Sequence, residues 1–435
     1  MVNLRLAGET VFARAFLVAN LLFFAVAILL MYDSQLAEAN AYLGYLPIEV
    51  EPVHLSLLVV SVLVAAMLMP VRIDRPSDFL SLLFGLFVIV PYAALHSIHG
   101  PVRVAEYLLN FLVLVLPVVV VLLVSRVVPA LRLPALLPPL AVEAAIALIC
   151  IGGVTYAVLH APSSAGIDLA GSYERRIEGR EAFPAGHLAA YVNAAVVNGL
   201  APLAAFVGGL LRQRVMPAIA LASSLAFFYV LGLKAPVFYV ALAWLIGVAV
   251  RKGWAGRFPA VVLGMLWGSL LISYVEYSYG GYSVVSDYFL RRVLVVPPFV
   301  LANFFDFLFQ DAFSDWSVLF GKDTPLGITF FVGEWYLGTK GTNANTNAFV
   351  YALASGGLPA YLLTILVVVV VFGYLDAVFR SRNSPGMLFA GFLYAILLVE
   401  QAATTALLSS GVAAVIVLAS LLRRRRTDAQ ALAGG

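Results

Sequence analysis

Charged residues and cysteine are both scarce in this chain of 435 residues. Only 11% of its residues are charged and 63% are apolar, whereas roughly a quarter of a soluble globular protein is charged. The single cysteine, Cys150, lies within an apolar run, so no internal disulfide can form. This composition excludes a soluble globular fold and predicts an all-α polytopic membrane protein, with 1–435 forming one integral domain.

Signature motifs of several enzyme classes are also missing. The sequence holds no Gly-x-x-x-x-Gly-Lys-Ser/Thr loop for ATP and no Gly-x-Ser-x-Gly elbow. It has no Asp-x-Asp pair to hold a nucleotide sugar through a metal, and no His/Cys cluster with metal-ligand spacing. We therefore expect no metal, no cofactor and no nucleic acid among its ligands.

About twelve apolar stretches are long enough to be transmembrane helices. The first one exceeds the apolar core of a cleaved signal peptide, so we expect it to remain as a span. The predicted spans are 11–31, 53–70, 78–98, 104–125, 135–160, 187–211, 215–232, 235–250, 258–277, 347–373, 386–404 and 405–422.

The distribution of Lys and Arg predicts the orientation of these spans. Alternate connections form two sets, and one set holds 17 of the 26 basic residues. Because cytoplasmic loops are enriched in Lys and Arg, we expect that set, both termini and the basic tail 423–435 to be cytoplasmic. The two long connections, 161–186 and 278–346, are then extracytoplasmic loops. They carry seven of the other nine basic residues, which indicates an anionic ligand.

The first extracytoplasmic loop, 161–186, concentrates its charges in a short stretch. Arg175, Arg176 and Arg180 alternate there with glutamates. One interpretation is a surface patch that neutralises itself through weak ion pairs. The other is a phosphate site just above the bilayer, because the planar guanidinium group binds phosphate through two parallel hydrogen bonds.

The longer loop, 278–346, is expected to host most of the chemistry. Asp287 can cap a short helix that carries Arg291 and Arg292, and Pro297-Pro298 should end or kink it. The aromatic segment that follows contains Asp306 and should form an interfacial or re-entrant helix packed on the bundle.

Aromatic, amide and carboxylate side chains occupy the end of the longer loop. Such groups suit sugar faces and hydroxyls, and they equally suit a membrane interface. We expect the asparagines to cap the next span, whose Ser355-Gly356-Gly357-x-Pro359 sequence should loosen the helix. The side chains concerned are Glu334, Trp335, Tyr336, Asn343, Asn345 and Asn347.

A few ionisable residues stand at the ends of spans. Lys234 lies in a tight outward turn, where an ammonium needs a partner or access to water. His160 and His187 flank the first loop, and each is either structural or a proton acceptor.

Several of these features together resemble Wzy-type oligosaccharide repeat-unit polymerases of bacteria, which are related to O-antigen ligases. They are Lys234 after Gly-Leu, Arg291-Arg292 followed by Pro and Phe-Phe-Asp-Phe, the Asn-x-Asn before a span, and Arg175 with ten residues before Gly186. A second Arg-x10-Gly is missing from the longer loop, where Lys322 precedes Gly333 at that spacing.

The resemblance implies an inner-membrane glycosyltransferase that joins repeat units carried on undecaprenyl pyrophosphate, without a metal. A chain-length regulator protein and membrane lipids are the partners it implies. Arginines would stabilise the diphosphate leaving group, because charge aimed at developing charge is typically the largest catalytic term. On this basis the candidate diphosphate ligands are Arg291, Arg292, Arg175, Arg176, Arg180 and Lys234. The preferred base is Glu334, ahead of Asp306 and His187. The candidate sugar ligands are Trp335, Tyr336, Asn345 and Asn347.

Three alternatives stay open at this point, of which a peptidoglycan-type polymerase is the most remote. An O-antigen ligase would use the same kind of donor and transfer the glycan to lipid A core. A transporter of lipid-linked oligosaccharide would also fit twelve spans, although transporters place their ionisable groups near the bilayer midplane, and here these groups gather in the loops.

Overall fold

The computed structural model describes residues 2–134, 136–168, 171–184, 186–311, 319–320, 324, 326–338 and 340–421. Over these ranges the chain is helical and has no strand. Among the described residues, eight helices are long and apolar enough to cross a membrane, and five shorter apolar helices accompany them. The chain is therefore an all-α, multi-pass membrane protein, as its composition predicts.

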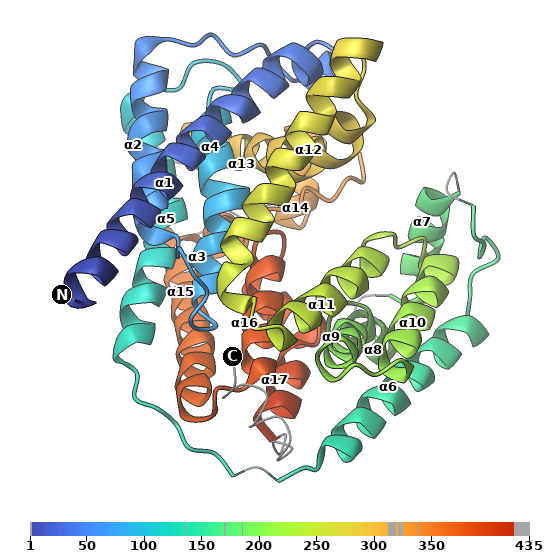
Figure 1. Ribbon diagram of the computed structural model, residues 1–435. Coiled ribbons are helices and arrows are strands. Elements are labelled where there is room, and N and C mark those ends of the chain that lie inside the picture. Colours follow the sequence, from blue (N-terminus) through green and yellow to red (C-terminus); the bar gives the residue numbers. More distant parts are fainter. Residues whose placement is uncertain are drawn as a thin grey trace. The chain divides into compact units, whose positions relative to one another are not determined.

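Each of the twelve predicted spans coincides with one helix or with a run of consecutive helices (Figure 1). The α-helices are α1 (Val2–Met31), α2 (Pro52–Leu68), α3 (Asp78–Phe84), α4 (Val90–Leu95), α5 (Val104–Val127), α6 (Pro139–Leu159), α7 (Ser172–Ala182), α8 (Leu188–Ala195), α9 (Ala201–Leu211), α10 (Val215–Leu231), α11 (Ala235–Arg251), α12 (Phe258–Gly280), α13 (Val296–Asp306), α14 (Ile328–Trp335), α15 (Ala348–Arg382), α16 (Pro385–Leu398) and α17 (Val412–Leu421). Wider, π-helical segments are η1 (Tyr32–Ala37), η3 (Gly85–Ile89), η4 (Val196–Leu200), η6 (Ser286–Val295), η7 (Phe307–Asp311) and η9 (Thr405–Ser409).

The chain divides into two compact units. Both units consist of apolar helices, so hydropathy does not distinguish them. The sequence alone therefore predicts a single domain. The longer loop belongs to unit 1 and the first loop to unit 2. Unit 1 comprises Met1–Val127, Arg257–Gly373 and Ala395–Ala403, and unit 2 comprises Val128–Gly256, Tyr374–Tyr394 and Thr404–Gly435.

In unit 1, polar side chains connect helices that are otherwise apolar. The indole nitrogen of Trp267 in α12 donates to the amide oxygen of Asn20 in α1 at 2.7 Å. The hydroxyl groups of Ser61 in α2 and Tyr107 in α5 are 2.6 Å apart. Such bonds are typical of membrane bundles, where a buried polar group finds no water and must bond to another helix.

A continuous helical segment, η6 followed by α13, was not among the predicted spans. By length and composition, Ser286–Phe309 could cross a membrane. However, both of its ends contact the same end of unit 1. Arg291 contacts Tyr45, which follows η1, and Asp306 contacts His99, which follows α4. Figure 1 draws α13 crosswise to α4, and the two helices are in contact. The contact with α4 agrees with the expectation of a helix packed on the bundle, and its interfacial position stays a prediction.

Pro297-Pro298 coincide with a boundary between two helical segments, since the predicted helix with Arg291 and Arg292 ends at Val295 and α13 begins at Val296. The chain stays helical through both prolines, which stand in the first turn of α13. Proline is tolerated there because the first N–H groups of an α-helix have no intrahelical acceptor. At Val296 the hydrogen-bond pattern changes from the π-helical one of η6 to the α-helical one of α13. The prolines therefore occupy the first turn of an α-helix, although the chain is helical on both sides.

The start of α15 follows the sequence prediction. The side-chain oxygen of Asn347 accepts hydrogen bonds from the backbone N–H groups of Phe349 and Val350, both at 3.1 Å, and so caps the helix. Farther along, Gly356 and Gly357 leave the helical conformation. Gly357 has φ = 65° and ψ = −162°, a conformation that is essentially restricted to glycine. The predicted loosening of this span is therefore present as a kink.

Candidate functional site

A short turn orients η6 at the end of α12. The carboxylate of Glu276 accepts hydrogen bonds from the backbone N–H of Val285 at 3.0 Å and from the hydroxyl of Ser283 at 2.8 Å. Together they hold the turn on the last helical turns of α12. The direction of η6, and of the arginines that it carries, is therefore set by residues just before it.

Arg291 is held in place on η6, and Arg292 is not. The Nε atom of Arg291 is 2.9 Å from a carboxylate oxygen of Asp287, one turn earlier, and its side chain also hydrogen-bonds Tyr45. The Tyr45 side chain is only 2% exposed, and burial raises the pKa of its hydroxyl to about 12, although Arg291 and Arg292 act in the opposite direction. Arg292 is exposed and forms no ion pair with any residue that the structure describes. This leaves one oriented and one accessible guanidinium on the same helix.

Two ring contacts lead from this arginine pair to a histidine. The ring of Tyr45 is 4.7 Å from that of Phe299 in α13. The Phe299 ring is in turn 4.7 Å from that of His99, edge to face. Such ring pairs stabilise by about 0.5–1.5 kcal/mol beyond the area they bury. The arginines of η6 and His99 are thus parts of one packed layer.

His99 orients the carboxylate of Asp306 through a hydrogen-bond chain. The amide nitrogen of Asn303 donates to the carbonyl oxygen of Phe299 at 2.8 Å, which fixes the orientation of that amide. The same nitrogen is 3.3 Å from Nε2 of His99, so Nε2 accepts. The proton then lies on Nδ1, which donates to the Oδ2 atom of Asp306 at 3.3 Å.

The exposure of these side chains increases from Asn303 to Asp306. Asn303 is 3% exposed, whereas the side chains of His99 and Asp306 are 22% and 34% exposed. The positioning groups are therefore inside the protein, and the carboxylate at the end of the chain is reachable from outside. A carboxylate held in this way can accept a proton from a hydroxyl group.

An aromatic cluster attaches α14 beside Asp306. The ring of Phe307, the next residue, lies 5.7 Å from that of Phe331 and 6.2 Å from that of Tyr336. The Phe331 ring stacks on Trp335 at 5.8 Å. These contacts bring α14, with Glu334, Trp335 and Tyr336, next to the end of α13. The sequence predicts all four of these site residues, and unit 1 gathers them in one region.

The asparagine-rich segment before α15 packs on the same helix. The backbone N–H of Ala344 donates to the carbonyl oxygen of Thr329 in α14 at 2.9 Å. Asn345 is exposed beside it, whereas Asn347 is 2% exposed and caps α15. Asn345 stays a candidate sugar ligand. The burial and cap bonds of Asn347 instead indicate that it positions this segment.

Arg175 of the first loop has a structural role, which corrects its assignment as a diphosphate ligand. Its side chain is 1% exposed, and its Nη1 atom lies 2.6 Å from a carboxylate oxygen of Asp168. The guanidinium also donates to the backbone oxygen of Asp168 and lies 5.5 Å above the ring of Phe228. Hydrogen bonds from Gly171 N–H and then from Arg175 lower the pKa of Asp168. A buried guanidinium with these partners is not accessible to a lipid headgroup.

The other candidates of unit 2 lie on α7 or next to the starts of α8 and α11. Arg176 is exposed on α7, which also contains Arg180, whose side chain lies outside the described part. Lys234 is exposed just before α11. His187 precedes α8, and its Nδ1 accepts a hydrogen bond from the backbone N–H of Ala189 at 3.3 Å. This contact makes His187 a helix cap, while Arg176, Arg180 and Lys234 stay predictions. Lys322 and the basic tail 423–435 lie outside the described residues.

The residues that position Asp306 were not predicted from the sequence. His99 lies 207 positions from Asp306 along the chain, and Tyr45 is even farther from Arg291. Three of the five histidines, His54, His96 and His99, fall within one short part of the sequence, and two of them lie next to the connection 99–103. That clustering was the available signal. Among the described residues, no group of His, Cys, Asp and Glu is arranged to hold a metal ion.

Comparisons with protein families, with curated proteins and with solved structures gave no match to this chain. The functional assignment therefore depends on the chemistry of the site in unit 1, which combines an oriented carboxylate, two arginines on the same helical segment and aromatic side chains on α14.

Proposed function

We propose that this protein is a bacterial inner-membrane glycosyltransferase that polymerises oligosaccharide repeat units carried on undecaprenyl pyrophosphate. In this proposal both termini are cytoplasmic, and the η6–α13 segment lies at the outer face of the membrane. The observation that carries the proposal is the Asp306–His99–Asn303 chain on the helical segment that also bears Arg291 and Arg292.

The reaction assigns a separate task to each end of this segment. Asp306 accepts the proton of an acceptor hydroxyl, whose oxygen forms a bond to the anomeric carbon of the donor glycan. The bond from that carbon to the diphosphate oxygen breaks, and the lipid diphosphate leaves with the electron pair. Arg291 and Arg292 stabilise the negative charge that develops on it. His99 and Asn303 are positioning residues, since they act through Asp306.

Aromatic side chains line the layer between the two ends of this segment. Two rings, Tyr45 and Phe299, separate the arginine end from the histidine end. Because the acceptor oxygen and the diphosphate oxygen bond to the same anomeric carbon, donor binding must bring the guanidinium groups of Arg291 and Arg292 and the Asp306 carboxylate to one reaction centre. Trp335 is 68% exposed on α14, and with Tyr336 and Asn345 it is suited to bind sugar rings and hydroxyls. Glu334 remains the alternative base.

Purified protein in nanodiscs, supplied with lipid-linked repeat units and no ion gradient, tests the proposal. The expected product is a ladder of longer lipid-linked glycans. Transfer only after lipid A core is added would instead indicate a ligase. Movement of the unaltered donor between leaflets, without any lengthening, would indicate a transporter.

A further inference from the structure

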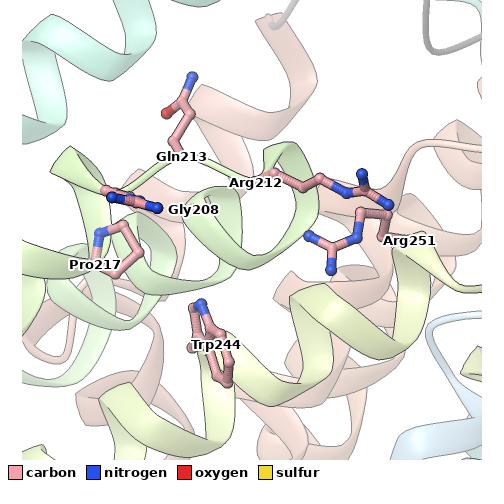
Figure 2. Close-up of a pocket in the computed structure, with 7 residues that line it drawn as sticks. Gly208, Arg212, Gln213, Pro217, Trp244 and Arg251 are labelled. Carbon is pink, nitrogen blue, oxygen red and sulfur yellow. The ribbon is translucent and has the colours of Figure 1, made fainter.

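Unit 2 contains a second basic site, separate from both loops. A pocket with a volume of about 430 Å³ lies between the end of α9, the start of α10 and the end of α11. This volume is in the range of small-molecule sites. Figure 2 shows the guanidinium groups of Arg212 and Arg251 extending into the same region, with the Trp244 indole on α11. The lining residues are Gly208, Arg212, Gln213, Arg214, Pro217, Trp244 and Arg251.

The walls of this pocket are held rigidly. A Cβ atom on Gly209 would come within 2.3 Å of the carbonyl oxygen of Trp244, and one on Gly247 within 2.2 Å of that of Phe206. Helices α9 and α11 therefore touch through their backbones, the close approach that small residues permit in membrane bundles. Arg251 donates from Nη1 to the carbonyl oxygen of Gly209 at 2.5 Å, so its guanidinium is fixed across this contact.

The arginines of the pocket lack a carboxylate partner within the described part of the chain. None of Arg212, Arg214 and Arg251 forms an ion pair with a residue in the described part of the chain. The Nε atom of Arg251 is buried without a hydrogen-bond partner. The nearby amide of Gln213 donates to the buried carboxylate of Glu143, at 3.2 Å from each oxygen.

The backbone conformation of Arg212 is a second feature of the pocket, independent of its charge. Its φ of 58° is in the left-handed region, which only one other non-glycine residue in the described chain, Asn383, enters. The left-handed conformation costs roughly 1–2 kcal/mol for a residue with a Cβ atom. A glycine at the end of α9 would avoid this cost. The arginine at position 212 is therefore less favourable for the backbone than glycine would be.

We propose that this pocket binds a phosphate-bearing ligand through Arg212, Arg214 and Arg251, with the Trp244 indole against its apolar part. Guanidinium groups bind phosphate oxygens through paired hydrogen bonds. Such a phosphate could belong to an anionic lipid headgroup or to a soluble phosphate ester. The inference is independent of the proposed glycosyl transfer, because it concerns binding at other residues.

Binding to purified protein in nanodiscs separates the two sources. In one arm, phosphatidylcholine nanodiscs are titrated with inorganic pyrophosphate or glycerol phosphate. In the other, native mass spectrometry counts phosphatidylglycerol molecules retained from mixed nanodiscs. Binding in the first arm identifies a soluble ligand, retention in the second identifies a lipid headgroup, and either result supports the site. Binding in neither arm would overturn it.

Substitutions assign the binding to the pocket. Arg212→Gln and Arg251→Gln should each weaken binding about tenfold to a hundredfold, as loss of charged hydrogen bonds does. Arg212→Gln serves if Arg251→Gln, which also loses the Gly209 contact, does not fold. The matched control is Lys252→Gln, next to Arg251, whose ammonium lies 4.6 Å above the Trp254 ring and does not line the pocket. An equal loss in Lys252→Gln would mean that general surface charge binds the anion, and would refute the site.

Discussion

The two long loops both carry adjacent arginines, yet these arginines have different roles. In the first loop, Arg175 is 1% exposed and its guanidinium is bonded to Asp168 of the same loop. In the longer loop, Arg291 is oriented by Asp287 and Tyr45, and Arg292 is exposed beside it. The first arrangement stabilises a loop, and the second presents positive charge at a surface.

This difference shows that basic residues in a loop do not by themselves define an anion site. What distinguishes η6 is that its arginines belong to a layer that also holds an oriented carboxylate. Arg175 and Arg291 each pair with a carboxylate of their own loop, and Arg292 on η6 is the exposed arginine that forms no ion pair with a described residue. Experiments that separate activity from stability can test this contrast.

The largest effect is expected from Asp306→Asn, which keeps the size of the side chain but removes the base. Glycan lengthening should fall by about 10²–10⁴-fold, the usual contribution of general base catalysis. The thermal midpoint should change little, because the side chain is a third exposed. His99→Gln should reduce the rate less and shift its pH profile. If Glu334→Gln abolishes lengthening while Asp306→Asn does not, the base is on α14.

A smaller loss is expected from Arg292→Gln, which removes the exposed charge on η6. Without one group that stabilises the leaving diphosphate, the rate should fall by about 10²–10³-fold. Single-turnover assays with lipid-linked donor would measure this change. The control is Arg103→Gln, another exposed arginine of unit 1, which is paired with Glu106. Similar losses in both variants would mean that surface charge in general, and not η6, assists the reaction.

In the first loop, Arg175→Met should affect stability more than activity. Its buried guanidinium makes charged hydrogen bonds whose loss costs about 1.5–3 kcal/mol. The thermal midpoint should therefore fall, while the rate per folded molecule is retained. Arg176→Met, on the exposed side of the same helix, should lower the midpoint less. If the Arg175→Met protein is folded and stable but fails to lengthen glycans, Arg175 acts in the reaction as a diphosphate ligand.

The smallest effect concerns pH. The pKa of Asp168 is lowered in the folded protein by Gly171 and Arg175, so the ionised form favours folding. This stabilisation is complete above the ordinary aspartate pKa and is lost as the pH falls through the lowered value. The midpoint difference between wild type and Asp168→Asn should therefore be present at neutral pH and disappear in strong acid. A difference that does not change with pH would exclude the ion pair as its cause.

Much of the fold follows from local sequence signals. The apolar runs predict the helices, Asn347 predicts the cap of α15, and the Gly356-Gly357 pair predicts its kink. These succeed because each depends on neighbouring residues only. Pro297-Pro298 predict where the helix that carries Arg291 and Arg292 ends, but not that α13 begins directly afterwards, because the π-helical pattern of η6 is not visible in the sequence.

The site was only partly predictable because some of its contacts join residues that are far apart in the sequence. Asp306, Arg291, Arg292 and α14 are near one another in sequence, so a loop-based argument can group them. The contacts that give them roles are long-range. His99 meets Asp306 across 207 positions, and no spacing rule predicts this pairing. Conversely, Arg175 was assigned to a ligand from its position just above the predicted bilayer and from the Arg-x10-Gly resemblance, and its pairing with Asp168 was not predicted.

The most direct test is to measure undecaprenyl diphosphate release and glycan length together in purified wild type and Asp306→Asn. If the η6–α13 layer catalyses the transfer, wild type releases one lipid diphosphate for each repeat unit added. Asp306→Asn then binds the donor but adds and releases almost nothing. Equal lengthening by the two proteins, or release of lipid diphosphate by wild type without any new glycosidic bond, would contradict the account.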